Sequence, residues 1–357
     1  MKLFLAEQKR LISAFLEKFL LEKENQCLAI DSWGKDLCQR LFDFSINGKM
    51  IRGALVSLAY SLYQKDDDDT IPEDVVKTAA LMELIQSGLL IHDDIMDRDV
   101  SRRGKDSLFF QYKKVFDQNK VNDSYHTGEA FGICVGDIAY FFAFQIISML
   151  NIDLFRKNRL IEFLSQELAT VGLAQMMDVY WGASGESPDQ KDILKLYTYK
   201  TGRYTFSLPL WLGALQAEAS ENDMNSLVTI GENLGVVFQI KDDELDLYQN
   251  QSKTGKPQGS DLRSGKYTLF IEYLLKEIIP SESQRFNAFF GKGDLNESDL
   301  LWTLELLNKY GIQEKMESII NLKNETVYHH LDKLNIRNSK AKDIFIQLIE
   351  YNRLRKV

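Results

Sequence analysis

Apolar residues recur three and four positions apart along most of the chain, which is the spacing of helices with one buried face. Alternation with a period of two, which is typical of a half-buried strand, is rare. The pattern predicts helices over residues 2–24, 48–64, 73–96, 126–150, 155–182, 190–219, 222–248, 267–279, 296–310, 312–333 and 339–353. Turn-forming residues separate several of them, at 65–74, 182–189 and 254–261.

Composition agrees with a single helical body. Only 5 of the 357 residues are proline, and 45% are hydrophobic, enough for a large core. Neither an internal repeat nor a Gly/Ser-rich linker divides the chain. We therefore expect one all-α domain over residues 1–357, with 1–24 as its opening helix and 267–357 as its C-terminal helices.

Charge and cysteine content narrow the function classes. A net charge of −9 argues against nucleic-acid binding by general electrostatics. The scattered Cys27, Cys38 and Cys134 form neither a disulfide framework nor a zinc site, so a cytoplasmic location is expected. The charged N-terminal segment is unlike a signal peptide. The most apolar stretch, 138–150, is shorter than the roughly 20 residues that cross a bilayer, so no transmembrane segment is expected.

Two acid clusters continue apolar helical stripes. In IQSGLLIHDDIMDRD, residues Ile85, Leu89, Asp93 and Asp97 are spaced by four and lie on one predicted helix face. The spacing recurs in LGVVFQIKDDELDLY, at Leu234, Phe238, Asp242 and Asp246, and Asp243 matches Asp94. By contrast, the acid run 66–69 has no apolar stripe and is interpreted as a solvated loop.

Carboxylates that face inward repel one another and lose hydration, unless a hard divalent cation holds them together. Mg²⁺ prefers oxygen ligands and completes its shell with water and substrate phosphate. The two D-D-x-x-D motifs therefore predict a Mg²⁺–diphosphate site, whereas solvated helix ends are the alternative interpretation.

Basic residues gather near the same segments, at predicted turns and helix starts where anions bind well. NGKMIRG places Lys49 and Arg52 three positions apart, on one face of the predicted helix 48–64. The others are Arg102 and Arg103 in SRRG, Lys200 beside Thr201 in YKTGRY, and Lys256 and Lys266 in the loop TGKPQGSDLRSGKYT. One such base alone is usually a surface residue, and it is the grouping that indicates an anion site.

These stretches resemble the trans-polyprenyl diphosphate synthase family, the head-to-tail prenyltransferases, in the expected order between residues 47 and 266. LLIHDDIMD with RRG resembles the first aspartate-rich motif of the family, FQIKDDELD the second, and GSDLRSGKYT its lysine loop. GICVGDIAY, AQMMD and YKTGRYTF resemble its G-D segment, its glutamine–aspartate pair and its K-T motif. NGKMIRG lacks the first glycine and the proline of the family's G-G-K-x-x-R-P but keeps both bases.

The resemblance implies an isoprenoid-synthase fold, a ring of long helices around a central cavity, and usually a homodimer. It implies that isopentenyl diphosphate is joined to an allylic diphosphate (dimethylallyl, geranyl or farnesyl) with release of pyrophosphate. It also implies Mg²⁺ as cofactor, about three ions per active site that bridge the diphosphate.

Residue roles follow from the same resemblance. Metal binding is expected of Asp93, Asp97 and Asp242, supported by Asp94, Asp243 and Asp246. The allylic diphosphate is expected to contact Arg102, Lys200, Lys256 and Lys266. Isopentenyl diphosphate is expected to contact Gly48, Lys49, Arg52, Gln86 and Arg103. Thr201 and Gln239, with Lys200, are expected to line the reacting carbons, whereas His92 is interpreted as packing.

Product length depends on the floor of the expected cavity. Gly88 and Leu89, five and four positions before Asp93, are not aromatic and leave the floor open, which predicts geranylgeranyl diphosphate (C20) or a longer product. Tyr140, Phe141 and Phe142 are expected to form a deeper floor, although ordinary core is the alternative. A farnesyl or longer-chain (C25 and above) synthase stays open.

Three other functions fit the sequence less well. A terpene cyclase normally carries an N-D-x-x-S-x-x-x-E second motif, whereas this chain has DDELD. A head-to-head synthase is disfavoured because the isopentenyl-binding bases are present. A non-catalytic partner subunit tends to lose aspartates, and both clusters are complete here. The basic tail with Arg353, Arg355 and Lys356 is expected either to shield the site or to fray.

Overall fold

The computed structural model describes residues 1–65, 70–248, 258–293 and 295–355. The chain forms two compact units, each built from separate stretches. Unit 1 comprises Met1–Glu162, Pro209–Ala219 and Ile336–Ile344, and unit 2 comprises Phe163–Leu208, Ser220–Asn335 and Phe345–Val357. The expectation of one domain stays a prediction.

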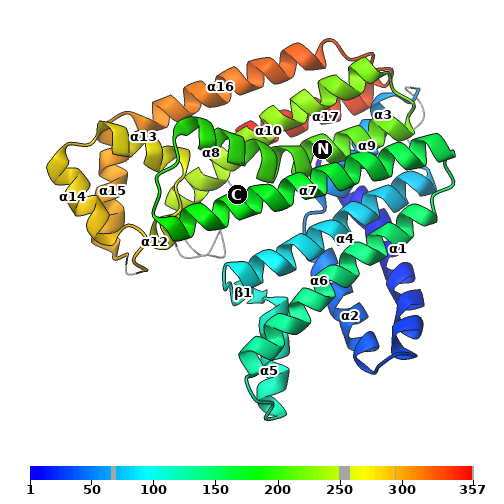
Figure 1. Cartoon of the computed structure of the whole chain (residues 1–357). Coiled ribbons are helices and arrows are strands. Elements are labelled where there is room, and N and C mark those ends of the chain that lie inside the picture. Colours follow the sequence, from blue (N-terminus) through cyan, green and yellow to red (C-terminus); the bar gives the residue numbers. More distant parts are fainter. Residues whose placement is uncertain (66–69, 249–257, 294, 356–357) are drawn as a thin grey trace. The chain divides into compact units, whose positions relative to one another are not determined.

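Unit 1 is helical apart from one short hairpin (Figure 1). Its elements are α1 (Lys2–Leu28), α2 (Trp33–Ile46), α3 (Ile51–Leu62), α4 (Glu73–Met96), β1 (Ser101–Arg102), β2 (Lys105–Asp106), α5 (Leu108–Gln118), α6 (Ser124–Ser148), the start of α7 (Leu154–Ser184), most of α9 (Leu208–Gln216) and the start of α17 (Ser339–Arg353). α4 packs against α6 and α3, α5 packs against α6, and α1 packs against α2.

The central helix of unit 1 is α4. It is apolar on nearly every side, and residues 78–88 are all buried, as expected for a helix with neighbours all round. Glu73 and Asp74 lie in its first turn, where negative charge favours a helix start. The hairpin after α4 turns at Arg103 and Gly104, whose φ angles of 52° and 74° are both positive, as in a type I′ turn.

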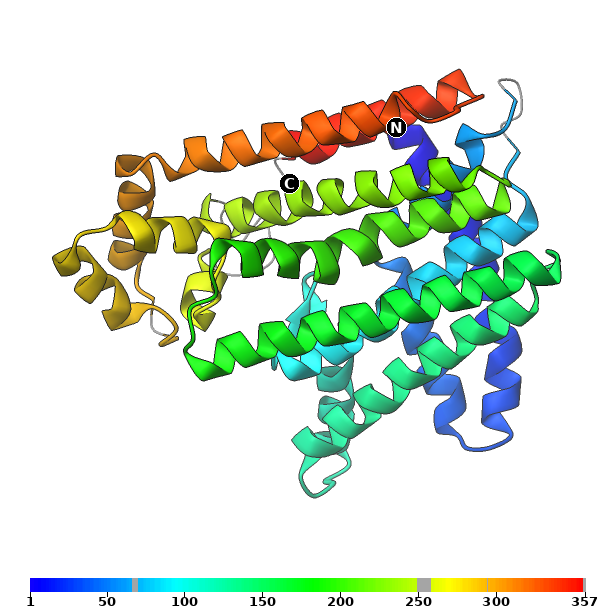
Figure 2. The same ribbon diagram turned by 45° about the horizontal axis from the view of Figure 1, so that its top comes forward.

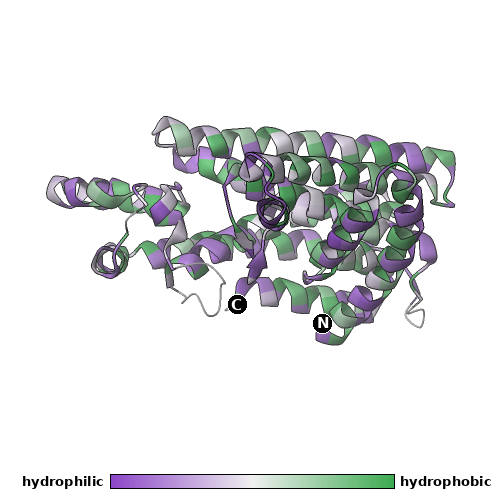
Figure 3. Ribbon diagram, turned by 90° about the horizontal axis from the view of Figure 1, so that it is seen from below, coloured by the Kyte–Doolittle hydropathy of each residue, from purple (hydrophilic) through white to green (hydrophobic). Residues whose placement is uncertain are grey.

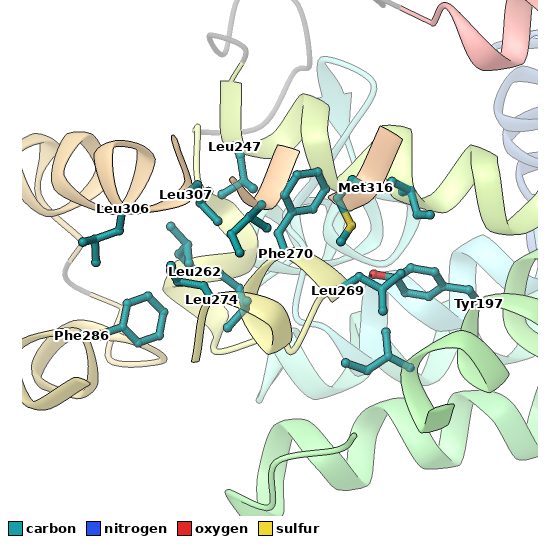
Figure 4. Close-up of a cluster of buried hydrophobic side chains, with 14 of the residues drawn as sticks. Tyr197, Leu247, Leu262, Leu269, Phe270, Leu274, Phe286, Leu306, Leu307 and Met316 are labelled. Atoms are coloured by element: carbon teal, nitrogen blue, oxygen red, sulfur yellow. Dashed lines mark hydrogen bonds between the residues drawn. The ribbon is translucent and has the colours of Figure 1, made fainter. Parts of the chain in front are cut away.

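Unit 2 contains the rest of α7 and α17 together with α8 (Gln190–Leu196), the π-helix η1 (Tyr197–Ser207), α10 (Glu221–Tyr248), α12 (Ser260–Ser264), α13 (Leu269–Glu277), α14 (Pro280–Phe289), α15 (Glu297–Lys309) and α16 (Ile312–Leu331). α10 packs against η1 and against α16 (Figure 2). Helices α12 to α15 share a buried apolar cluster, in which Phe270 and Leu274 of α13 and Phe286 of α14 lie with leucines of α12 and α15 (Figure 4).

The all-α prediction is confirmed, since the described residues form strands only at 101–102 and 105–106. The predicted helices 73–96, 222–248 and 339–353 agree with α4, α10 and α17 to within one residue. The sequence analysis missed α2, α5 and α14, which are short helices of 10 to 14 residues. It also read 190–219 as one helix, whereas α8, η1 and α9 occupy that stretch.

Polar and apolar residues alternate along most helices, as the hydropathy colouring shows (Figure 3). Two helices among the described residues, α4 and α6, are long and apolar enough to cross a membrane by length and composition alone. The apolar window of α4 is 83% buried, as in the core helix of a soluble protein, and that of α6 is 44% buried. Part of α6 therefore presents apolar side chains on the surface.

Candidate active site

The first acid cluster lies at the C-terminal end of α4 in unit 1. Asp94 is fully buried, Asp93 is half-buried, and Asp97 is exposed as the residue that caps the helix. The expectation that the stripe from Ile85 to Asp97 stays buried is thus wrong at its last position. The reason is that the helix ends at Met96, so Asp97 already belongs to the turn.

Arg102 of β1 binds two acids of this cluster. Its Nε donates to Oδ1 of Asp94, and its Nη2 donates to Oδ2 of Asp93 over 3.4 Å. Burial raises the pKa of Asp94 to about 7, although the charge of Arg102 acts in the opposite direction. Arg102 therefore compensates the buried carboxylate and fixes the hairpin beside the acids.

The segment before α3 carries the predicted diphosphate-binding bases. Met50 has a left-handed φ of 50°, and α3 starts only at Ile51. The expectation that Lys49 and Arg52 share a helix face is therefore wrong, because Lys49 precedes the helix. The guanidinium of Arg103 lies against Gly48, where an added Cβ would be 2.9 Å from its Nη1.

Arg52, Arg102 and Arg103 lie close enough in unit 1 for their charges to act on one another. Burial lowers the pKa of Arg103, and the like charges of Arg102 and Arg52 lower it further, while Glu83 acts against them. A cluster of this kind binds anions well, because an anion relieves the repulsion between the guanidinium groups.

Glu83 of α4 is a buried residue that the sequence analysis missed. It accepts the backbone N–H of Gly53 over 2.8 Å, and so holds the start of α3. Burial raises the pKa of Glu83, while that hydrogen bond and the charges of Arg52 and Arg103 act to lower it. In the sequence, the signal for Glu83 was an acid inside an otherwise apolar helix. A separate contact holds Gly48, since Lys9 of α1 donates to its carbonyl over 2.8 Å.

Gly88 allows α4 and α6 to approach closely. A Cβ on Gly88 would lie 2.7 Å from Cε1 of Tyr140 and 2.9 Å from the carbonyl oxygen of Gly136. The space beside Gly88 is thus filled by Tyr140. His92 packs edge-on against the same ring and its Nε2 lies 3.1 Å from the carbonyl oxygen of Ile133, in agreement with a packing role.

The three aromatic residues expected to form a cavity floor point in different directions. Phe141 is 63% exposed, and Phe142 is buried edge-on against Phe19 of α1. A floor made of all three is therefore wrong, because consecutive helix residues are rotated by about 100°. Leu89 is half-buried and Gln86 is buried, both on α4.

The second acid cluster lies near the end of α10 in unit 2. Asp242 is exposed, Asp243 is buried, and Asp246 is half-buried. Asp246 accepts the backbone N–H groups of Ser260 over 3.2 Å and Asp261 over 3.0 Å, at the start of α12. Burial and the charge of Asp261 raise the pKa of Asp246, while these hydrogen bonds oppose the shift.

Asp243 lies in a buried polar network that runs from η1 to α13. It accepts from the Tyr197 hydroxyl and, over 2.9 Å, from the amide of Gln239. Thr201 Oγ1 donates to Oε1 of Gln239 over 2.9 Å, and the N–H of Leu269 donates to the Tyr197 hydroxyl over 3.1 Å. Burial raises the pKa of Asp243. Tyr197 was missed, since nothing in the sequence distinguishes it from core.

The predicted lysines of unit 2 lie among these acids. Lys200 donates to Asp178 of α7. Burial acts to raise the pKa of Asp178, but the charges of Lys200 and Lys266 outweigh it and lower the pKa. Lys266 lies 3.7 Å from Asp261, whose charge is the main cause of its raised pKa. Lys256 lies outside the described residues.

The C-terminal tail reaches the second acid cluster within unit 2. Nη1 of Arg355 lies 3.0 Å from Oδ1 of Asp242, and its guanidinium stands 4.2 Å from the centre of the Phe238 ring. Arg353 donates to Glu350 of its own helix instead. Lys356 lies outside the described residues. The tail thus contacts a predicted metal ligand, while its shielding role stays a prediction.

In the described part of the chain, no group of three or more His, Cys, Asp or Glu side chains converges as a preformed metal site. The donor chemistry nevertheless fits Mg²⁺, which takes one or two carboxylates and completes its shell with water and substrate phosphate. In unit 1, Asp93 and Asp97 keep exposed oxygen atoms, and in unit 2 Asp242 does.

Comparisons with known proteins agree with the motifs. Residues 34–307 match the family described as Polyprenyl synthetase. The chain is 32% identical over 260 residues to a short chain isoprenyl diphosphate synthase of Methanocaldococcus jannaschii, covering 73% of this chain and 72% of that protein. It is 27% identical to a geranylgeranyl diphosphate synthase of Methanosarcina mazei, covering 85% of each.

Among solved structures, a geranylgeranyl pyrophosphate synthase from Corynebacterium glutamicum, complexed with isoprenyl diphosphate and magnesium, matches with a TM-score of 0.89. The two chains are 26% identical, and the match covers 98% of this chain and 99% of that one. The fold of this chain is accordingly that of the isoprenyl diphosphate synthases.

Proposed function

We propose that this chain condenses isopentenyl diphosphate with an allylic diphosphate to give geranylgeranyl diphosphate (C20). The proposal starts from the fact that the chain belongs to the polyprenyl synthetase family and is a trans-prenyltransferase. The observation that carries the proposal is that both D-D-x-x-D motifs are complete and end core helices. The grouping of Arg103 with Arg52 and Arg102 supports it, since clustered guanidinium groups suit a second diphosphate.

The acids within each motif have two different roles, metal binding and anchoring. Asp93 and Asp97 in unit 1, and Asp242 with Asp246 in unit 2, would hold the Mg²⁺ ions, about three in all, and these would supply positive charge for the departing diphosphate. Asp94 and Asp243 are bound by Arg102 and by Tyr197 with Gln239, which supports an anchoring role for these two acids. Arg102, Lys200, Lys256 and Lys266 supply the remaining positive charge for the allylic diphosphate.

Isopentenyl diphosphate binds the basic residues of unit 1. Arg52 and Arg103 clasp its oxygen atoms, Lys49 adds a third cation from the segment before α3, and Gln86 donates an amide hydrogen. Gly48 lets the guanidinium of Arg103 approach the backbone. Fixed in this way, the double bond of isopentenyl diphosphate meets the allylic carbon at short range.

Thr201 and Gln239 face the reacting carbons. The Thr201 hydroxyl gives its hydrogen to Gln239, so its oxygen lone pairs stay available to steady positive charge on the allylic carbon. Gln239 in turn is oriented by Asp243. The proton lost from the condensed cation goes to the departing pyrophosphate.

Product length tests this function. With Mg²⁺, excess isopentenyl diphosphate and labelled allylic primers, the purified chain is expected to make C20 as its main product, resolved by chromatography. Leu89→Phe is expected to shift the main product to C15, because the ring would close the half-buried space under Asp93. Leu90→Phe, rotated by about 100° on the same helix, is the matched control. A wild-type protein that makes only C15 contradicts the C20 assignment.

A non-catalytic partner subunit is the second candidate function. It predicts no turnover by the chain alone with any primer, and turnover after a second protein is added. Both complete acid clusters favour the catalytic role. The cytoplasmic location stays a prediction.

We further propose that the chain forms a homodimer through α6 and the first part of α7. Apolar side chains of unit 1 are exposed along one side of α6, and two more follow at the start of α7: Ile133, Phe141, Phe144, Met149, Leu154 and Phe155. An exposed apolar patch of this kind marks an interface, and a two-fold contact buries the same patch on both copies.

Phe141→Glu is expected to raise the dimer dissociation constant by about 100-fold, because two buried charges enter the two-fold interface. Sedimentation or light scattering on a concentration series measures the shift. Leu301→Glu, at an exposed leucine of α15, is the control and should leave the dimer intact. Equal dissociation constants for Phe141→Glu and wild type would place the interface elsewhere.

A further inference from the structure

A long π-helix interrupts unit 2 between α8 and α9. η1 runs over 11 residues, Tyr197–Ser207, and carries the proposed reaction residues Lys200 and Thr201. π-Helical turns are rare and usually single, and they occur often at functional sites. A stretch of this length needs contacts from its surroundings to keep its register.

Arg203 provides such contacts to two neighbouring helices. Its Nε donates to Oε2 of Glu167 over 2.8 Å and its Nη2 to Oε1 over 2.5 Å, a two-pronged pairing with α7. Its Nη1 donates to Oε1 of Glu232 on α10 over 2.8 Å. Glu167 is fully buried, and its hydrogen bonds are the main cause of the raised pKa of Arg203.

The neighbouring residue brings η1 into backbone contact with α10. A Cβ added to Gly235 would lie 2.0 Å from the Cα of Gly202, and one added to Gly202 would lie 3.0 Å from the carbonyl oxygen of Glu232. The contact between Gly202 and Gly235 fixes the distance between η1 and α10, but two glycines have no side chains that would prevent η1 from rotating about its axis. The planar fork of Arg203 supplies direction, since it binds only in one orientation.

The same turns of η1 present the reaction residues. Lys200 donates to Asp178 of α7, and Thr201 donates to Gln239 of α10. We propose that Arg203 is a positioning residue: its bridge between Glu167 and Glu232 holds the π-helical register of η1 and so places Lys200 and Thr201. This inference rests on the proposed function of those two residues and assigns no direct substrate contact to Arg203.

Stability and positioning can be separated, because a buried ion pair replaced by apolar groups of similar size is often neutral or stabilising. Arg203→Met combined with Glu167→Leu removes the directional bridge and leaves no unpaired charge at Glu167. The single variant Arg203→Met leaves that carboxylate buried and unpaired, so it is expected to lose both stability and activity.

The double variant is expected to keep a Tm within about 5 °C of wild type. Its kcat is expected to fall on the order of tenfold or more, because displaced groups no longer meet the reacting carbons. KM for isopentenyl diphosphate is expected to stay within about twofold, since the residues that bind it are unchanged. Hydrogen exchange, followed by mass spectrometry, is expected to accelerate in peptides covering 197–207.

Asp223→Asn is the matched control. Asp223 is buried in unit 2, and its partner Asn335 follows α16 and is not part of η1, so its loss should lower Tm and leave kcat unchanged. A double variant with wild-type kcat, or with unchanged exchange over 197–207, overturns the inference. An inactive wild-type protein would instead overturn the proposed function, and the exchange measurement would still decide whether Arg203 holds the register.

Discussion

Replacing Asp93 or Asp242 with asparagine is expected to lower kcat on the order of a thousandfold, equivalent to about 4 kcal/mol of transition-state stabilisation. Both carboxylates keep exposed oxygen atoms and are proposed to hold Mg²⁺ against the departing diphosphate. Asparagine preserves the shape of the side chain but offers a metal ion only a neutral oxygen. Steady-state kinetics at saturating Mg²⁺ measures the loss.

Calorimetric titration with Mg²⁺ and inorganic pyrophosphate gives a second readout that does not depend on turnover. Both variants are expected to bind the pair more weakly than wild type. Asp332→Asn, at an exposed carboxylate that caps α16, is the control and should change neither measurement. Variants of Asp93 and Asp242 with kcat within threefold of wild type would remove the metal assignment.

Gly235→Ala is expected to destabilise the protein by about 3 kcal/mol, because the added methyl group meets backbone and not a movable side chain. The new Cβ would lie 2.0 Å from the Cα of Gly202, so η1 must move away from α10. Lys200 and Thr201 would move with it, and kcat is expected to fall as well. Urea unfolding measures the change in the free energy of unfolding.

The matched control is Gly182→Ala on α7. No atom lies within 4 Å of a Cβ at that position, so the helix accepts the methyl group. The same substitution is there expected to stabilise by about 0.5 kcal/mol through helix propensity. If both variants unfold at the same urea concentration, the close packing of η1 on α10 is not what stabilises unit 2.

The contact of Arg355 with Asp242 bears on the Asp242 variant. A guanidinium 3.0 Å from the carboxylate supplies positive charge at a proposed metal ligand before any divalent ion binds. A metal ion on that carboxylate would compete with Arg355 for its oxygen atoms, which would link the C-terminus to the filling of the site.

The sequence predicted the two helices that carry the acids correctly, because their chemistry and their periodicity coincide. The spacing of four predicted α4 and α10 with their acids at the C-terminal ends, because the apolar stripes and the carboxylates lie on the same helices. It misjudged which acids are buried. Asp94 and Asp243 are the buried pair, and each has a partner outside its motif. Arg102, beyond the end of α4, binds Asp94, and Tyr197, 46 residues earlier in the chain, binds Asp243.

The π-helical type of η1 and the start of α3 could not be predicted from the sequence. η1 follows the same apolar spacing as an α-helix, and only its contacts with Glu167, Glu232 and Gln239 identify what holds a π register. The start of α3 at Ile51 depends on the left-handed Met50 and on Glu83 from α4. A positive φ is uncommon for a residue other than glycine, and Glu83 lies outside the segment 47–53.

The sequence by itself determined the all-α class, the two acid-ended helices and the family, because these depend on residue type and on spacing within one helix. Only the tertiary structure decided which carboxylates are buried, which bases pair with them, and how Tyr140 fills the space beside Gly88. Those outcomes depend on partners brought together from distant segments, and a side chain's burial and pKa are properties of its neighbours.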